Sequence, residues 1–213
     1  MWTWTLNWGR VREDLVVGSC PMTVDDIDTI RARTGSTALL SVQHDECRAT
    51  FGIDLEQHRQ HAHSIGLAYA NVPMRDFDLD DQRRRLPGAV RRLAALLDAG
   101  HSVYVHCTAG INRAPLTVLG LLTFVEALAP DHAFDILRAG RPQAEPYWDA
   151  WRGCRDDLLA PRREAIAQRA FRLSQNATQE SPESHWHRAE AEVLREDLLA
   201  VHAGDRADAL TSP

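Results

Sequence analysis

The sequence of 213 residues contains no lysine, and all 24 of its basic residues are arginine. With 30 acidic residues the formal net charge is −6, which argues against nucleic acid or an anionic membrane as a partner of the chain. Because arginine fills every basic position, an arginine at any single position is weak evidence for ligand recognition. The charge composition therefore excludes a class of partners more firmly than it identifies a site.

Cysteine is scarce, and the four present have no CxxC spacing: Cys20, Cys47, Cys107 and Cys154. This argues against a zinc site of paired cysteines and against a dense disulfide framework. The first residues lack the basic and then apolar pattern of a secretory signal. We therefore expect a cytoplasmic protein. The most apolar stretch, residues 114–128, is interrupted by Glu126 and is too short to span a bilayer, so we expect a buried core helix there.

Apolar runs of strand length alternate with segments of helical periodicity. This order predicts an α/β fold with a mostly parallel sheet covered by helices on both faces. The expected strands are residues 15–18, 37–43, 67–74 and 102–106. The expected helices are residues 23–34, 54–65, 79–99, a helix from 113, 131–139 and 147–159.

The composition changes after Ala160, where arginine, glutamate and alanine become frequent. We expect residues 1–160 to form the main domain and residues 161–213 to form a helical hairpin extension with a frayed end. Its two helices are predicted over residues 161–173 and 184–202, with a polar break over 174–182.

The segment VYVHCTAGINRAP, residues 103–115, carries the clearest chemical signal. A strand runs into a loop and then into a helix, and Cys107 and Arg113 are separated by five residues. Amides of such a loop can cradle an anion at the helix N-terminus, and Arg113 can bind two of its oxygens. A thiol in that field ionises readily, which makes Cys107 a candidate nucleophile toward a phosphomonoester. The phosphate-binding loop residues would be Thr108, Ala109, Gly110, Ile111, Asn112 and Arg113.

Attack by the thiolate would give a phosphocysteine intermediate and expel an oxyanion that needs a proton. The candidate acids lie in MRDFDLDD, residues 74–81, after another expected strand. Asp76 is the first candidate and Asp78 the second, while Asp80 and Asp81 are expected to cap the next helix. This reaction uses neither a metal nor a cofactor, and we predict none.

These residues resemble known enzymes. The stretch from His106 to Arg113 is similar to the H-C-x5-R signature of dual-specificity cysteine phosphatases, and more closely to the plant starch-excess glucan phosphatases. The further shared motifs are R-A-P at residues 113–115, R-D-F-D at 75–78 and R-x-D-L-x-V-G-S-x-P at 12–21. The resemblance implies a three-layer fold like that of protein tyrosine phosphatases, with Asp76 as general acid, Cys107 as nucleophile and Arg113 as phosphate clamp.

The resemblance also implies an aromatic channel for a phosphorylated glucan. Phe77 and Phe51 occupy its aromatic positions, and we place His106 with them among the substrate-binding residues. Thr50 replaces one aromatic of the family's pair, and Asn112 stands where glycine is usual, a position at which asparagine would tolerate a left-handed backbone. The alternatives are a phosphoprotein substrate with dual Tyr and Ser/Thr specificity, and a module that binds phosphate without turnover.

Other features receive less specific interpretations. The histidines of HRQHAH, residues 58–63, are expected on a solvated helix rather than in a metal site. Trp2, Trp4 and Trp8 alternate as on one face of an edge strand. The last segment is weakly similar to a small bacterial helical domain of unknown function.

Overall fold

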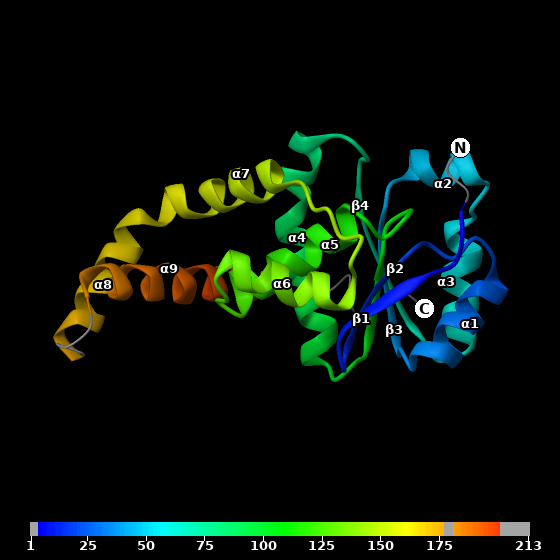
Figure 1. Ribbon diagram of the computed structural model, residues 1–213, viewed down its shortest axis with the longest axis horizontal. Helices are drawn as coiled ribbons and strands as arrows, with labels where there is room; N and C mark the ends of the chain where they lie inside the picture. The colour runs from blue at the N-terminus through cyan, green and yellow to red at the C-terminus, as the bar shows by residue number, and fades with distance from the viewer. Residues whose placement is uncertain (1–3, 177–180, 201–213) are drawn as a thin grey trace.

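The computed structural model describes residues 4–176 and 181–200, which are arranged around a central five-stranded sheet (Figure 1). The strand order is β1-β2-β5-β3-β4. β1 is antiparallel to β2, and the other neighbouring pairs are parallel. The strands are β1 (Trp8–Arg12), β2 (Leu15–Gly18), β3 (Ala38–Gln43), β4 (Ala68–Met74) and β5 (Val103–His106). The predicted mostly parallel sheet is confirmed.

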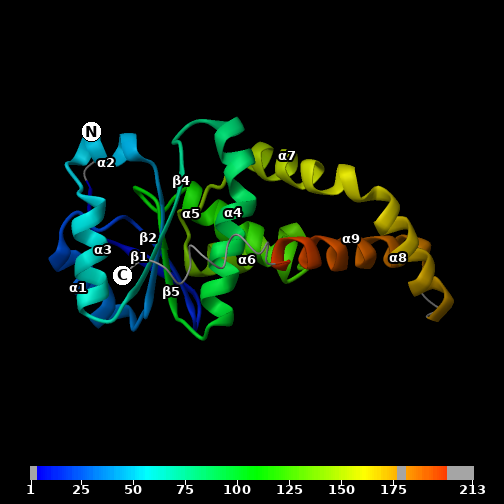
Figure 2. The same ribbon diagram turned by 180° about the vertical axis from the view of Figure 1, so that it is seen from behind.

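Helices cover both faces of the sheet, which gives the three layers expected from the sequence. α1 (Val24–Thr34) and α3 (Leu55–Ser64) lie on one face, and α2 (Asp45–Phe51) lies near one end of the sheet on the same side (Figure 1). On the other face lie α4 (Leu79–Asp98), α5 (Arg113–Gly120) and α6 (Pro130–Gly140), as the view from behind also shows (Figure 2). α7 (Trp148–Leu159) packs against α4.

Local sequence signals explain several element boundaries. Thr23 and Asp26 form a reciprocal capping box at the start of α1, and Gly35 ends that helix with a left-handed φ of 71°. Asp54 is the N-cap of α3, a position at which aspartate is favoured, so the start of this helix also follows from a local signal. The histidines of α3 differ from the solvated helix that we expected, because His58 is only 3% exposed. Its neighbour His61 contacts Asp28 at the surface.

The alternation of β5 directs its side chains into two different cores. Val103, Val105 and the following Cys107 belong to the core beneath α4 and α5. Tyr104 belongs to the smaller core beneath α1 and α3. Because successive strand residues point to opposite faces, Cys107 emerges at the end of the strand on the α5 side.

The apolar stretch after the cysteine loop forms the expected buried helix. α5 is buried from Arg113 to Gly120 and continues as a π-helical turn over Leu121–Val125, which is also buried. This segment ends at Glu126, the residue that interrupts the apolar stretch in the sequence. Among the described residues, no helix combines the length and apolar character needed to cross a membrane.

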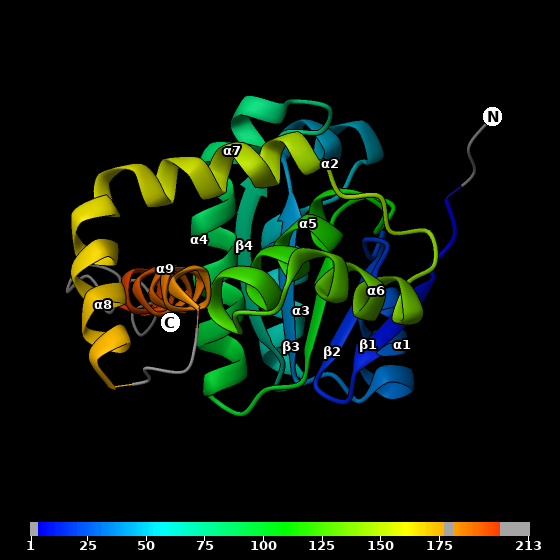
Figure 3. The same cartoon turned by 60° about the vertical axis from the view of Figure 1, so that its left-hand side comes forward.

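Two further helices extend from the body (Figure 3). α7 passes through a 3-10 turn at Ala160–Arg162 into α8 (Arg163–Asn176), and α9 (Pro182–Leu199) returns alongside α8 to contact α4 and α7. The core beneath α4 extends into these helices through Ile166, Ala189, Val193, Leu194 and Leu198. The domain boundary after residue 160 stays a prediction, and the expected frayed end lies outside the described residues, as does Trp2.

Candidate active site

The loop between β5 and α5 turns all of its carbonyl groups outward. The six consecutive carbonyl oxygens of residues 107–112 each accept a hydrogen bond from a neighbouring element or from the chain itself. In order, the donors are His106 Nδ1 to Cys107, Cys20 N to Thr108, Arg141 to both Ala109 and Gly110, Glu145 N to Ile111, and Leu116 N to Asn112. Four of these six carbonyls, those of residues 108–111, are therefore held by distant parts of the sequence.

The outward carbonyls determine where the amides point. In a planar trans peptide the N–H is opposite the C=O, so the N–H groups of residues 108–112 face the inside of the loop. In the described part of the chain, none of these five N–H groups donates a hydrogen bond to another group. Converging free amides of this kind form an anion-binding concavity, here with the N-terminus of α5 beside it.

Glycine is required at one position of this loop. Gly110 has a φ of 69°, and a Cβ added there would lie 2.4 Å from the carbonyl oxygen of Gly18. Asn112 differs from the expectation of a left-handed backbone, because its φ is −112°. Its side-chain amide instead donates to the Glu145 carbonyl at 3.1 Å. The left-handed residue of the loop is thus Gly110, and Asn112 ties the loop to the segment before α7.

Arg113 lies buried beside the loop, with a side chain only 1% exposed. Its Nη2 donates to Asp76 Oδ2 at 2.6 Å and to Thr108 Oγ1 at 3.1 Å. Its Nη1 donates to the carbonyl of Met74 at 3.0 Å and contacts the sulfur of Cys47 at 3.4 Å. Burial acts to lower the pKa of Arg113, but the nearby Cys107 and Asp76 raise it above its ordinary value, so the guanidinium stays charged.

One nitrogen of this guanidinium has no partner among the described residues. Nε of Arg113 is buried and makes no hydrogen bond. A buried donor left unpaired costs free energy, which an oxygen of a bound anion would recover. This unpaired donor and the inward amides belong to the same short stretch of chain, so both favour an anion at this place.

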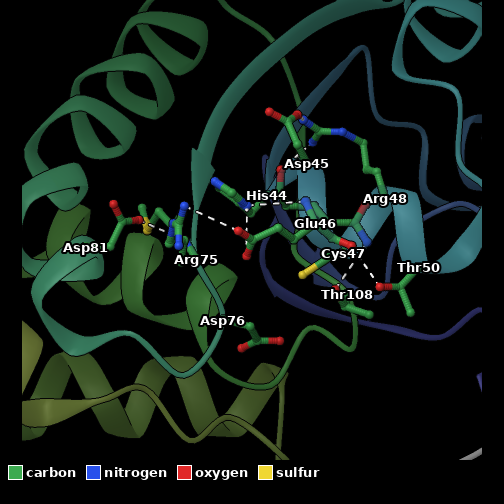
Figure 4. Close-up of polar contacts among 12 residues, drawn as sticks. His44, Asp45, Glu46, Cys47, Arg48, Thr50, Arg75, Asp76, Asp81 and Thr108 are labelled. Carbon is green, nitrogen blue, oxygen red and sulfur yellow. Dashed lines mark hydrogen bonds and ion pairs between the residues drawn. The ribbon is translucent and has the colours of Figure 1, made fainter.

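The structure separates the two candidate acids. Asp76 follows β4, is 28% exposed and contacts Arg113 (side chain shown in Figure 4). Asp78 is the N-cap of α4, where its Oδ1 accepts from the Asp81 N–H at 2.9 Å. Asp81 in turn accepts from the Arg75 N–H at 2.8 Å. Of the two candidates, therefore, Asp76 lies beside the cysteine loop and does not cap a helix.

The short helix α2 contributes contacts that sequence reasoning missed. Figure 4 shows its side chains beside the loop, with Glu46 paired to Arg75 at 3.3 Å. The buried Arg48 donates to the carbonyl of Gln43, whose own amide donates to Thr108 Oγ1 at 3.1 Å. Cys47, for which no role was predicted, contacts Arg113. No periodic pattern marks this helix of 7 residues, so no local signal pointed to these contacts.

The predicted aromatic positions do not share one hollow. Phe77 is 82% exposed and has a left-handed φ of 57°. It lines a hollow of about 410 Å³ together with Leu79, Pro146, Tyr147, Trp148 and Asp149. Phe51, at the end of α2, does not line this hollow. A second hollow of about 470 Å³ lies against Ala109 and Ile111 of the loop and includes Trp8.

His106 does not occupy a substrate-contacting position, which corrects the expectation from the sequence. It is 2% exposed, and its ring lies near that of Tyr104, with 6.2 Å between the ring centroids. The alternation of β5 places it on the face opposite Cys107. Burial lowers the pKa of His106 to about 4, so it is neutral near pH 7 and supports the loop through the Cys107 carbonyl.

Comparisons with known proteins relate this chain to a family. A family model described as dual specificity phosphatase, catalytic domain, matches residues 34–153. Phosphoglucan phosphatase DSP4, amyloplastic, of Castanea sativa is 32% identical over 163 residues, which are 76% of this chain and 43% of that protein. Laforin of Mus musculus is 29% identical over 130 residues, which are 56% of this chain and 39% of that protein.

Solved structures share the fold. The PTP-2 phosphatase of Cydia pomonella superposes with a TM-score of 0.57 at 16% identity, covering 70% of this chain and 88% of that one. The predicted fold like that of protein tyrosine phosphatases is confirmed by this likeness. The chain spans less than half the length of the two curated relatives named above.

Proposed function

This chain belongs to the dual specificity phosphatase family, and from that premise we propose that it hydrolyses phosphomonoesters through a phosphocysteine intermediate on Cys107. The observation that carries the proposal is the outward orientation of the six carbonyl groups of residues 107–112. It leaves five amides and the unpaired Nε of Arg113 to receive the oxygens of a phosphate dianion. The charge of such a dianion is stabilised there by donors that are already in place.

In the first step the Cys107 thiolate attacks phosphorus. The S–P bond forms, the bond from phosphorus to the leaving oxygen breaks, and its electron pair stays on that oxygen. Asp76, as a carboxylic acid, gives this oxygen its proton. In the unliganded site Asp76 contacts Nη2 of Arg113 at 2.6 Å. Oxygens of the arriving phosphate compete for this nitrogen and release Asp76 toward the leaving group.

In the second step water hydrolyses the intermediate. The Asp76 carboxylate takes a proton from water while the water oxygen attacks phosphorus. The S–P bond breaks, the thiolate is regenerated, and inorganic phosphate leaves. The same aspartate thus serves first as acid and then as base.

The proposed substrate is a phosphorylated glucan. Two relatives support it by name as phosphoglucan phosphatases, one in Castanea sativa and one in Arabidopsis thaliana. The exposed Phe77 beside the acid, facing a hollow that also contains Tyr147 and Trp148, supports a role in holding sugar rings. A phosphoprotein is the second candidate, because Mpk3 of Drosophila melanogaster, named a dual specificity protein phosphatase, is 28% identical over 80 residues.

A phosphate-release panel tests the proposal. Wild type, Cys107→Ser and Cys154→Ser are assayed with an aryl phosphate, a solubilised phosphoglucan and phosphopeptides. Cys154 is a buried residue of α7 and serves as the matched control. We expect wild type and Cys154→Ser to release phosphate fastest from the glucan, and Cys107→Ser to release none. Faster release from phosphopeptides would favour the second candidate, and phosphate binding without any release would leave only a capture module.

A further inference from the structure

A single arginine outside the cysteine loop holds two of its carbonyls. Arg141 follows α6 directly, and its Nε donates to the Gly110 carbonyl at 3.1 Å while its Nη2 donates to the Ala109 carbonyl at 2.9 Å. The residue is 3% exposed. In the described part of the chain these two carbonyls have no other donor. The guanidinium fork therefore fixes two successive peptides at once.

Close packing of two glycines brings this arginine into place. A Cβ on Gly9 of β1 would lie 1.9 Å from the Gly140 carbonyl oxygen, and a Cβ on Gly140 would lie 2.3 Å from the Arg10 carbonyl oxygen. Only glycine at both positions lets the end of α6 approach β1 this closely. The next residue, Arg141, then lies directly behind the loop.

Burying the Arg141 guanidinium costs free energy unless its donors make hydrogen bonds or ion pairs. Burial lowers the pKa of Arg141 below its ordinary value, although Tyr104 and Cys107 act in the opposite direction. Among the described residues, the Arg141 side chain makes no ion pair, and both of its hydrogen bonds go to loop carbonyls. A buried cation without a carboxylate partner is not expected to stabilise the fold, which argues against a purely stabilising role for Arg141.

We propose that Arg141 is a positioning residue that sets the phosphate-binding amides by holding the Ala109 and Gly110 carbonyls outward. These two peptides carry the N–H groups of Gly110 and Ile111, so the fork aims two of the five inward donors. Only the expected effect of Arg141 on turnover rests on the proposed phosphatase function. Its effect on phosphate binding is independent of turnover.

The test compares Arg141→Met, Arg141→Lys and Arg138→Met in the full chain. Arg138 is an exposed arginine in the last turn of α6, three residues before Arg141, and controls for loss of one positive charge. Readouts are the dissociation constant of inorganic phosphate by calorimetry, and kcat and KM with an aryl phosphate. In Arg141→Met we expect phosphate affinity to fall about tenfold or more, with KM rising by a similar factor and kcat changing less. Arg138→Met should match wild type.

Lysine should not restore binding, because one ammonium cannot reproduce the planar fork on two carbonyls. Arg141→Gln keeps a single amide donor and serves as the second variant if Arg141→Met does not fold, with an intermediate loss expected. Wild-type phosphate affinity in the Met or Gln variant, or full rescue by lysine, would overturn the proposal. If wild type binds phosphate but releases none from esters, the proposed function fails while the loss of binding in Arg141→Met still supports this one.

Discussion

At the scale of single residues, the two aspartates that lie two and four positions after the end of β4 have different roles. Asp76 contacts the buried Arg113, whereas Asp78 caps α4. We expect Asp76→Asn to lower kcat about a hundredfold or more for an alkyl phosphate, because the leaving oxygen loses its acid, and less for an aryl phosphate, whose oxygen leaves more easily. Steady-state kinetics with both substrates checks this.

The matched control is Asp78→Asn. Asparagine is as good an N-cap as aspartate, so this variant should keep both its stability and its activity. If Asp78→Asn loses the alkyl phosphatase activity while Asp76→Asn keeps it, the two assignments must be exchanged.

His106 links the stability of the loop to pH. Burial lowers its folded pKa to about 4, below the value near 6.5 of an unfolded histidine, so the unfolded state binds the proton first as pH falls. Stability is therefore lost progressively from about pH 6.5 toward about pH 4. His106→Gln should reduce the loss between about pH 7 and about pH 5 by about 2 kcal/mol.

Urea unfolding at the two pH values measures this change. His58 is also buried with a lowered pKa and remains in the variant, so part of the pH dependence should persist. An unchanged pH dependence in His106→Gln would show that His106 does not carry the effect.

At the scale of secondary structure, the loop after β4, which carries Asp76, also contains a phenylalanine that has a strained backbone and is exposed. Phe77 has a φ of 57° and is 82% exposed, so neither backbone preference nor burial explains a phenylalanine there. We expect Phe77→Asn to raise the free energy of unfolding by about 1 kcal/mol, because asparagine adopts this backbone more easily.

The same variant should lose phosphoglucan activity while keeping aryl phosphatase activity. Phe171, 66% exposed on α8, provides the control, since Phe171→Ala should leave both activities unchanged. Equal losses on both substrates in Phe77→Asn would mean that Phe77 shapes the acid loop rather than holding the sugar.

The sequence predicted those elements whose signals are local. The capping box at Thr23 and the left-handed Gly35 mark α1 without any help from the rest of the chain. It missed α2, which is short and is fixed by contacts from Gln43 and Arg113. It also missed the donors that hold the cysteine loop, because Cys20, Arg141 and Glu145 meet only after folding. Motif spacing therefore located the loop and the nearby Asp76, but not the hydrogen-bond donors that surround the loop.

At the scale of the whole molecule, the helical extension shares its core with the catalytic body. Leu194 of α9 is 4% exposed and belongs to the core cluster beneath α4 and α7. Removing its side chain leaves a cavity in that shared core. We expect Leu194→Ala to lower the free energy of unfolding by about 2–5 kcal/mol.

The unfolding of this variant also tests the domain boundary predicted after residue 160. If the core is shared, loss of helix and loss of aryl phosphatase activity should coincide in one transition at a lower urea concentration. Two separate transitions, with activity kept through the first, would show that the extension folds independently.

The most direct test of the central claim is mass spectrometry of the enzyme quenched during turnover of an aryl phosphate. The account predicts a phosphoryl group on the peptide that contains Cys107 in wild type, and none in Cys107→Ser, which should also be inactive. Rapid turnover by Cys107→Ser, or a phosphoryl group on another residue of the active wild type, would contradict it.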